Sequence, residues 1–215
     1  KGGKIINQLK RLGASCDWSR LRFTMDEGLT KAVRKAFVTY YKKGLIYRGE
    51  KMINWCPRCK TALANDEVEH QERKGNLWHL KYPIADSKGN PTDEYIVVAT
   101  TRPETMLGDM AVAVNPKDER YFNLHGKKVL LPVKNRLIPI ICDEFVDKEF
   151  GTGLVKVTPA HDPNDYEMGL KHGLEVEKVI GEDGKMTSCA GEFEGMTREE
   201  ARDAVVKKMQ ELGLV

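Results

Sequence analysis

The sequence has no apolar run that approaches the roughly 18–20 residues needed to cross a bilayer, and it has no secretory hydrophobic segment. Its five cysteines are an odd number spread along the chain, which argues against a disulfide framework. Internal repeats and low-complexity tracts are also absent. These absences exclude a membrane-spanning or disulfide-stapled protein, and they favour a protein of the reducing cytoplasm that has no membrane partner.

A chain of 215 residues with 40% hydrophobic and 31% charged residues can form one substantial core, or a core with an appendage. The net charge of +3 is unevenly distributed. Residues 1–70 carry 15 Lys and Arg against 7 Asp and Glu, whereas residues 71–215 carry 20 against 25. A basic flank suits contact with a phosphate backbone, although basic helices are more often simply solvated.

Residues 1–72 are predicted to form a helical and linker arm. Residues 4–12 have helical spacing that stops at Gly13, and a second helix begins after Asp26 and ends before Gly44. The chain starts with Lys-Gly-Gly instead of Met and stops at Gly-Leu-Val. We therefore expect a fragment trimmed at both ends, or a processed chain.

Residues 73–215 are predicted to form a β-rich domain. Short β-like runs separated by turn residues occupy 77–82, 95–101, 110–114, 128–133, 137–142 and 153–158. A short helix is expected over 163–172, a hairpin turn at 182–184, and a last helix behind a capping box at Thr197. The predicted fold class is α+β, with a β-barrel-like sheet and a flanking N-terminal helical arm.

Polar residues crowd at the ends of two predicted strands. In Thr100–Asp109, an apolar strand runs into three hydroxyls, a cation and a proline that breaks the ladder. In Phe150–Tyr166, a strand flanked by glycines places Lys156 and Thr158 on one face, because strand side chains alternate. The loop after this strand presents three further polar residues: His161, Asp162 and Asp165.

These groups allow two interpretations. Two carboxylates can bind an ammonium while lysine, arginine and threonine donate to carbonyl, hydroxyl or phosphate oxygens, so the set suits a small zwitterionic ligand. Alternatively, Asp162 and Asp165 only cap the following helix, and the remaining groups decorate a strand edge. Composition and spacing alone leave both interpretations open.

The two segments resemble known pocket motifs. Thr100-Thr-Arg-Pro-Glu-Thr-Met-Leu-Gly-Asp109 resembles the threonine-rich segment of the editing domains of class I aminoacyl-tRNA synthetases. Gly151-Thr-Gly-Leu-Val-Lys-Val-Thr-Pro-Ala-His-Asp-Pro-Asn-Asp-Tyr166 resembles their second pocket segment. Arg102 together with Glu104-Thr105-Met106-Leu107 is similar to the valine-specific branch, and the similarity extends to residues 13–18 and 23–26. The resemblance therefore covers practically the whole chain.

This resemblance implies an ester hydrolase that removes threonine from mischarged valine tRNA. A hydrophobic synthetic site rejects threonine by only about 10²-fold, because threonine and valine differ by a hydroxyl in place of a methyl. A polar second site corrects this, since burying a methyl against unpaired polar groups costs roughly 1–3 kcal/mol each. The implied partners are the tRNA acceptor 3′ end, threonine as product and the rest of the synthetase.

The resemblance also implies roles for individual residues. Asp165 would anchor the substrate α-ammonium, Lys156 and Asp162 would read the threonine hydroxyl, and Thr105 would exclude larger side chains. The other expected substrate contacts are Thr100, Thr101 and Arg102 at the terminal adenosine or ester carbonyl, Phe150 and Asp147 on the adenosine side, and Thr158 and His161. His161 could also be a general base, although a histidine in such a loop is more often structural. None of these residues is an obvious covalent nucleophile, so a positioned water is expected to attack.

Trp55-Cys56-Pro-Arg-Cys59 has the spacing of half a tetrahedral zinc site. No second close cysteine pair follows, and His70 is only a possible third ligand. The resemblance implies that the further zinc ligands come from outside this chain. It also implies that editing requires no cofactor. A plain structural turn and zinc bound within this chain remain open, whereas a thioredoxin-like pair lacks the surrounding βαβ pattern.

Two other functions compete with threonine editing. The chain could hold a tRNA end without turnover, or it could be an editor of the leucine or isoleucine type. The nucleotide-binding signatures of class I synthetases, His-x-Gly-His and Lys-Met-Ser-Lys-Ser, are absent from the sequence. We therefore expect no amino acid activation by this chain.

Overall fold

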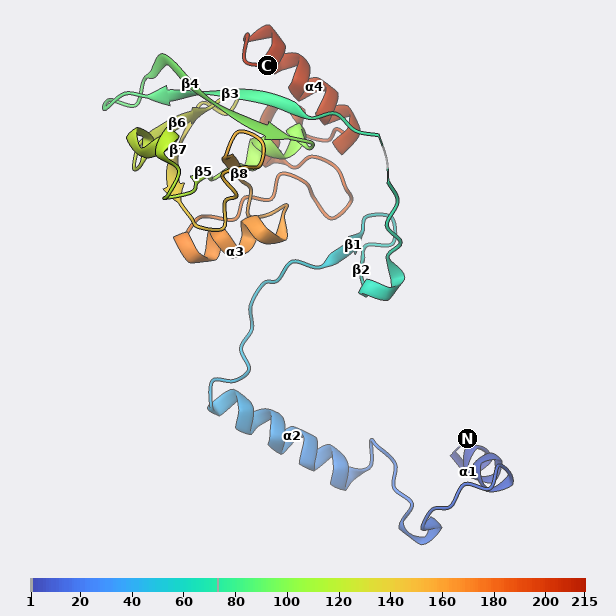
Figure 1. Ribbon diagram of the computed structural model, residues 1–215. Coiled ribbons are helices and arrows are strands. Elements are labelled where there is room, and N and C mark those ends of the chain that lie inside the picture. The colour runs from blue at the N-terminus through green and yellow to red at the C-terminus, as the bar shows by residue number, and fades with distance from the viewer. Residues whose placement is uncertain (1, 73) are drawn as a thin grey trace. The chain divides into compact units, whose positions relative to one another are not determined.

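All six strands predicted between residues 77 and 158 form one curled sheet in the computed structural model (Figure 1). The strand order is β4-β3-β6-β7-β5-β8, and only β5 and β7 run parallel. The strands are β3 Trp78–Ala85, β4 Pro91–Thr100, β5 Ala111–Val114, β6 Lys128–Leu131, β7 Arg136–Cys142 and β8 Leu154–Val157. The two end strands, β4 and β8, also contact each other, so the sheet curls into a half-barrel. The predicted α+β class and barrel-like sheet are confirmed.

The structure describes residues 2–72 and 74–215, and the chain divides into two units between Lys51 and Met52. The sequence placed this boundary at residues 72 and 73, because β-like runs become dense only after Asn76. Residues 52–72 instead group with the second unit. There, the short strands β1 Asn54–Cys56 and β2 Thr61–Leu63 pair, and Trp55 Nε1 donates to the carbonyl oxygen of Glu182 at 2.8 Å.

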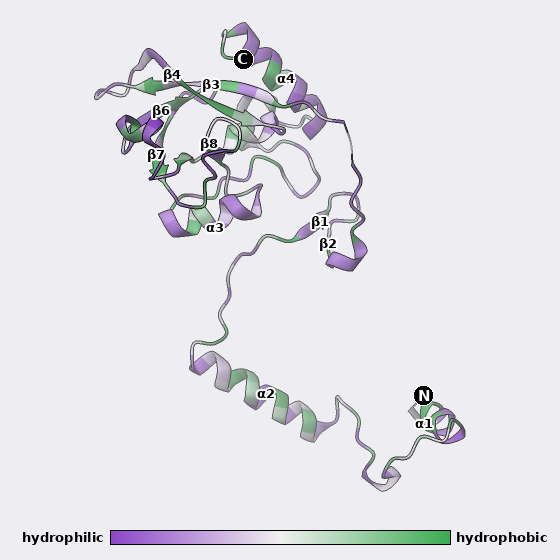
Figure 2. Cartoon of the chain, in the orientation of Figure 1, coloured by the Kyte–Doolittle hydropathy of each residue, from purple (hydrophilic) through white to green (hydrophobic). Residues whose placement is uncertain are grey.

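The first unit contains two of the predicted helices, α1 Gly2–Arg11 and α2 Glu27–Lys42. Asp26 caps α2 by accepting a hydrogen bond from Leu29 N, and Gly44 leaves the helix at a φ of +71°. Hydrophobic residues recur along α2 (Figure 2), yet none of its side chains is buried. Among the described residues, no helix is long and apolar enough to span a bilayer.

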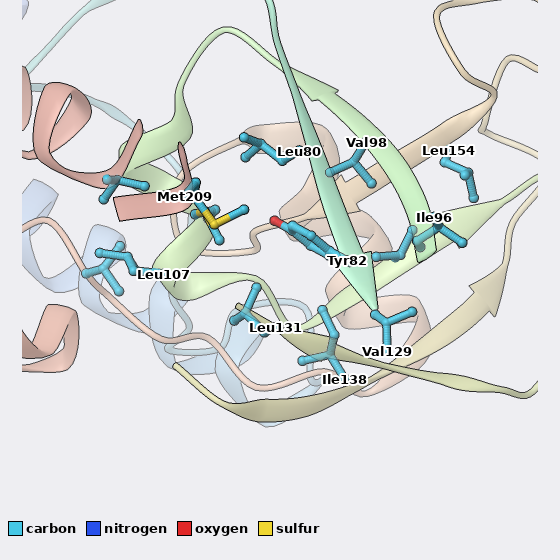
Figure 3. Close-up of a cluster of buried hydrophobic side chains, with 14 of the residues drawn as sticks. Leu80, Tyr82, Ile96, Val98, Leu107, Val129, Leu131, Ile138, Leu154 and Met209 are labelled. Carbon is cyan, nitrogen blue, oxygen red and sulfur yellow. The ribbon is translucent and has the colours of Figure 1, made fainter. Parts of the chain in front are cut away.

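The core of the second unit lies against one face of the sheet. Alternate residues of β3 and β4 face it, and Figure 3 shows Tyr82 among Leu80, Val98 and Leu131. Met106 and Leu107, which follow β4, are also fully buried. Burial of a large apolar side chain stabilises a fold by about 1.5–3 kcal/mol, so this cluster holds the sheet in its curled form.

Two helices complete this unit. α3 Pro163–His172 is capped by Asp162 and ends at Gly173, whose φ of +65° suits a residue without Cβ. α4 Arg198–Glu211 begins with the predicted Thr197–Glu200 capping box and buries Ala201, Val205 and Met209. The 182–184 turn is also confirmed, since Ile180 and Met186 form an antiparallel bridge around it.

An ion pair fastens α4 to the segment that follows β4. Arg202 Nε and Nη2 donate to the two carboxylate oxygens of Glu104 at 2.9 and 2.7 Å, and Glu104 is fully buried. A buried carboxylate without its partner is strongly destabilising, because its desolvation is no longer offset. Arg202 therefore secures the turn from Pro103 to Gly108 as well as the helix.

We expect Arg202→Ala to lower the free energy of unfolding by about 3 kcal/mol, because it leaves Glu104 buried without its bidentate partner. Arg198→Ala on the same helix is the matched control. Its partner Glu199 is exposed, so little change is expected. Urea denaturation followed by tryptophan fluorescence measures both values, and equal losses in the two variants would contradict the assignment.

Candidate active site

The two polar strand ends meet at one cavity of about 380 Å³. Thr100 ends β4 on one side, and Val157 ends β8 on the other, before the loop that leads into α3. The cavity is lined by Leu77, Ala99, Thr100, Thr101, Arg102, Thr105, Phe145, Phe150, Gly151, Thr152, Leu154, Val155, Lys156, Thr158, His161, Asp162, Asn164 and Asp165. Every site residue predicted between residues 73 and 215 lines it except Asp147.

Lys156 lies at the wall of this cavity with 11% of its side chain exposed. Its Nζ donates to Thr158 Oγ1 at 2.6 Å, to Thr105 Oγ1 at 3.0 Å and to Asp109 Oδ1 at 3.2 Å. An ammonium has three N–H groups, so all of them are used by protein acceptors. The contact with Thr158 also confirms that these two side chains share one face of the strand.

Asp109 is the counter-ion of Lys156 and is fully buried behind the wall. Its Oδ1 also accepts from the Thr158 hydroxyl at 2.6 Å, and its Oδ2 accepts from the Tyr82 hydroxyl at 2.7 Å. Burial raises the pKa of Asp109, while Lys156 and the two hydroxyls oppose that rise by favouring the charged form. Burial also raises the pKa of Tyr82, which keeps the phenol protonated as a donor.

Sequence reasoning gave neither Asp109 nor Tyr82 a role in the site. Tyr82 lies on the same face of β3 as Leu80 and Ile84, which is the pattern of an ordinary core side chain. Asp109 carried a usable signal, because it stands between the apolar pairs Met106-Leu107 and Met110-Ala111. A carboxylate in such a stretch requires buried partners.

Asp165 brings a carboxylate to the cavity next to Thr158. It is 8% exposed, and its Oδ2 accepts from Thr158 N at 2.8 Å. Burial raises the pKa of Asp165 to about 6. A cationic ligand would stabilise the ionised form of this buried carboxylate, because its charge would compensate for the lost hydration.

Asp162 fits both interpretations of the sequence at once. Its Oδ1 caps α3 by accepting from Asn164 N at 2.8 Å and Asp165 N at 3.2 Å. It also lines the cavity. The cap orients the carboxylate, and its second oxygen has no hydrogen bond to any residue that the structure describes.

His161 is held by its surroundings. Its Nε2 accepts from Val179 N at 3.0 Å, and its carbonyl oxygen accepts from Arg102 Nη1 at 2.8 Å. Burial lowers the pKa of His161 to about 4, so the ring is neutral at neutral pH. Because the Nε2 lone pair is occupied, this arrangement favours the structural interpretation over that of a general base.

Arg102 lines the cavity together with the hydroxyls of Thr100 and Thr105. Thr100 Oγ1 accepts from Arg102 N at 3.1 Å, and Thr105 Oγ1 donates to the Arg102 carbonyl oxygen at 2.9 Å. The Arg102 side chain is 44% exposed, with Nε 3.8 Å from the Glu104 carboxylate. Arg102 therefore presents a fixed cation beside Thr101 at the open side of the cavity.

Two exposed aromatic rings line the cavity entrance. Phe150 was predicted from the resemblance, whereas Phe145 was not, and 77% and 65% of these residues are exposed. Exposed rings offer flat apolar faces on which a base can stack. Asp147 lies outside the lining set, and its Oδ1 accepts from Glu149 N at 2.9 Å in a local turn.

Cys56 ends β1, and Cys59 lies in the turn that leads into β2. Cys59 N donates to Cys56 Sγ at 3.4 Å, and backbone N–H groups of Cys59 and Arg58 lower the pKa of the Cys56 thiol. Over residues 2–72 and 74–215, no three His, Cys, Asp or Glu side chains are grouped so as to hold a metal ion. The arrangement suits two ligands of a site, and the expected dependence on outside ligands stays a prediction.

The family model described as tRNA synthetases class I (I, L, M and V) matches residues 1–212. The valine–tRNA ligase of Syntrophotalea carbinolica is 60% identical over 214 residues, which is 100% of this chain and 23% of that protein. The corresponding ligase of Geobacter sulfurreducens is 59% identical, over 100% of this chain and 24% of its own length. The chain thus spans about a quarter of these relatives.

A solved structure supports the fold independently. The crystal structure of GlLeuRS-CP1 matches with a TM-score of 0.50 and 15% sequence identity, covering 65% of this chain and 97% of its own. At this identity the likeness concerns the fold alone. It agrees with the half-barrel sheet and the α+β class described above.

We expect chelation to leave the stability of this chain unchanged, because two thiols cannot complete a four-ligand zinc site. Thermal unfolding with and without EDTA measures the effect, and zinc content of the purified chain is the companion measurement. Cys56→Ser/Cys59→Ser should respond to EDTA as the parent chain does. Stoichiometric zinc together with a lower unfolding midpoint in EDTA would contradict the half-site interpretation.

Proposed function

The chain belongs to the class I tRNA synthetases of the isoleucine, leucine, methionine and valine group, and from this premise we propose that its cavity hydrolyses mischarged aminoacyl-tRNA. The proposed substrate is threonine esterified to a valine tRNA. The identity of 59–60% to two valine–tRNA ligases supports the choice of tRNA. The observation that carries the proposal is the pairing of Asp162 and Asp165 with the Lys156 cluster in one small cavity.

Asp165 is proposed to bind the α-ammonium of the aminoacyl group. Its Oδ2 is already fixed by Thr158 N, so the carboxylate is held in place before a ligand arrives. An ammonium close to this carboxylate would offset the burial that raises its pKa. This interaction is worth roughly 1.5–3 kcal/mol when a charged group takes part.

The side-chain end of the substrate is proposed to meet Asp162, Thr105 and the Lys156 cluster. A threonine hydroxyl can pair with these groups, whereas the methyl of valine leaves them unpaired. The difference of roughly 1–3 kcal/mol per unpaired group corresponds to about 10- to 10²-fold per contact. Two such contacts would supply the discrimination that a hydrophobic synthetic site lacks.

The reaction is hydrolysis of the ester between the threonine carboxyl carbon and a ribose oxygen. A water oxygen attacks the carbonyl carbon, the bond from that carbon to the ribose oxygen breaks, and the ribose oxygen takes up a proton. Arg102 and the hydroxyls of Thr100 and Thr101 line the same cavity, and they would contact the ester or terminal adenosine there. Phe150 would stack against the adenine, and neutral His161 would hold Arg102 through its carbonyl oxygen.

The rest of the synthetase is the proposed partner of the first unit. α2 exposes the apolar side chains of Val33, Phe37 and Tyr40, with no buried residue of its own. An uncovered apolar helix face of this kind is typical of a surface that packs against another domain. The basic residues of the same helix would then approach the tRNA backbone.

We expect Asp165→Asn to lower kcat/KM for deacylation of Thr-tRNA(Val) by about 10²-fold, because the charge that binds the ammonium is lost. The amide oxygen can still accept from Thr158 N, and neutralising a buried carboxylate should leave the unfolding midpoint at pH 7 unchanged or higher. Glu167→Gln, an exposed change on the same helix, is the matched control and should retain full activity.

Release of threonine from labelled Thr-tRNA(Val), with Val-tRNA(Val) as a control substrate, is the measurement. Undiminished hydrolysis by Asp165→Asn would overturn the assigned role. Binding of the tRNA without any turnover by the parent chain would instead identify a binding module. Faster hydrolysis of Ile- or Val-charged tRNA than of Thr-tRNA would identify a leucine- or isoleucine-type editor.

We expect kcat/KM to fall about tenfold per unit well below pH 6, and to fall again above about pH 8 as the α-ammonium of the substrate loses its proton. Asp165 must be ionised to bind an ammonium, and its pKa of about 6 in the free protein sets the acid limb. The ammonium favours the ionised form, so the acid limb of kcat should lie at lower pH than that of kcat/KM. The uncatalysed hydrolysis is subtracted at each pH, and a profile without a limb between pH 5 and 7 would exclude this role.

A further inference from the structure

The polar cluster behind the cavity has a defined hydrogen-bond direction. Lys156 gives its three N–H groups to Thr105, Thr158 and Asp109. The Thr158 hydroxyl donates to Asp109, and the Thr105 hydroxyl donates to the Arg102 carbonyl oxygen. Each donor of the three side chains that line the cavity here is therefore already used within the protein.

What Lys156, Thr105 and Thr158 still offer a ligand is acceptor capacity. A hydroxyl has one hydrogen and two lone pairs. Thr105 and Thr158 each donate their hydroxyl hydrogen to a protein acceptor and accept one hydrogen bond from Lys156. One lone pair on each hydroxyl oxygen is therefore left. The open oxygens of Asp162 and Asp165 in the same cavity are also acceptors when ionised.

Asp109 fixes the direction of the hydrogen bonds in this cluster, because each of its own polar atoms is hydrogen-bonded within the protein. Its amide donates to Met106 O at 3.0 Å, its carbonyl oxygen accepts from Arg136 Nη2 at 2.9 Å, and Tyr82 donates to Oδ2. Asp109 and Tyr82 are both fully buried and do not line the cavity. They can act on a ligand only through Lys156 and Thr158.

We propose that Asp109 and Tyr82 are positioning residues that fix Lys156 and Thr158 so that the cavity recognises the substrate's side-chain hydroxyl as a hydrogen-bond donor. This inference rests on the proposed function and deepens it. Lys156 then donates to the hydroxyl oxygens of Thr105 and Thr158 and orients them, instead of donating to the substrate. The sieve accepts threonine because its hydroxyl can donate, and it rejects valine because a methyl cannot.

An isosteric ligand separates donation from size. The probes are three non-hydrolysable amides in which threonine, valine or 2-amino-3-fluorobutyrate is joined to 3′-amino-3′-deoxyadenosine. Fluorine replaces the hydroxyl at similar volume but carries no hydrogen to donate. Calorimetric titration of residues 1–215 should give a Kd for the threonyl amide at least about 10-fold lower than for either other amide.

Variants test the positioning residues. Tyr82→Phe removes only the donor to Asp109 Oδ2, and Asp109→Asn keeps an amide oxygen that can accept from Lys156 and Thr158. We expect each to reduce the ratio of fluorobutyryl Kd to threonyl Kd at least about threefold, whereas a merely structural loss would weaken all three ligands equally. Tyr95→Phe, an exposed change on β4, is the matched control and should keep the ratio. Circular dichroism confirms that each variant is folded.

The outcomes are distinct from those of the deacylation assay. Equal affinity for the threonyl and fluorobutyryl amides overturns the inference, as does an unchanged ratio in folded Tyr82→Phe. Selective binding without hydrolysis of Thr-tRNA overturns the proposed reaction and leaves the donor-recognition inference standing. Failure of all three amides to bind overturns both.

Discussion

The buried ion pair between Lys156 and Asp109 is the contact on which the arrangement of the site depends. Moving both charges out of water costs several kcal/mol each, and their attraction offsets that cost only if the remaining hydrogen-bonding groups are satisfied. Thr158 and Tyr82 donate hydrogen bonds to the Asp109 carboxylate, and Arg136 donates to its backbone carbonyl oxygen. The result is a rigid polar wall inside an otherwise apolar sheet. Such a wall can present a ligand with a fixed set of acceptors.

A second ion pair, with a fully buried carboxylate, holds the turn that contributes Thr105 to the cavity. Arg202 on α4 clamps Glu104, which lies in the turn between β4 and Asp109. Thr105, which faces the cavity, is the neighbour of Glu104 in that turn. The helix at the end of the second unit therefore stabilises a cavity to which it contributes no lining residue. The stability of the unit and the shape of the cavity are therefore coupled through this turn.

The cap of α3 and the lining of the cavity also share a residue at this site. Asp162 caps α3 with one oxygen, which orients the carboxylate, and Asp165 lies in the first turn of the same helix. Because Asp162 both caps the helix and lines the cavity, its loss would weaken α3 and change the cavity at once. His161 shows the complementary case, since its contacts to Val179 and Arg102 position the Arg102 side chain without offering a free Nε2.

Local patterns in the sequence were sufficient for the six strands, the helices and the caps at Asp26 and Thr197, because side-chain alternation, helical spacing and capping act over a few residues. The choice of lining residues, correct except for Asp147, also needed the family resemblance. The roles of Asp109 and Tyr82 required the tertiary structure. Tyr82 meets Asp109 across 27 positions and Lys156 meets Thr105 across 51, and only the strand order brings them together. The sequence by itself determined which polar groups reach the cavity, whereas the fold decided which of their donors and acceptors remain available, because hydrogen bonds between distant segments use the rest.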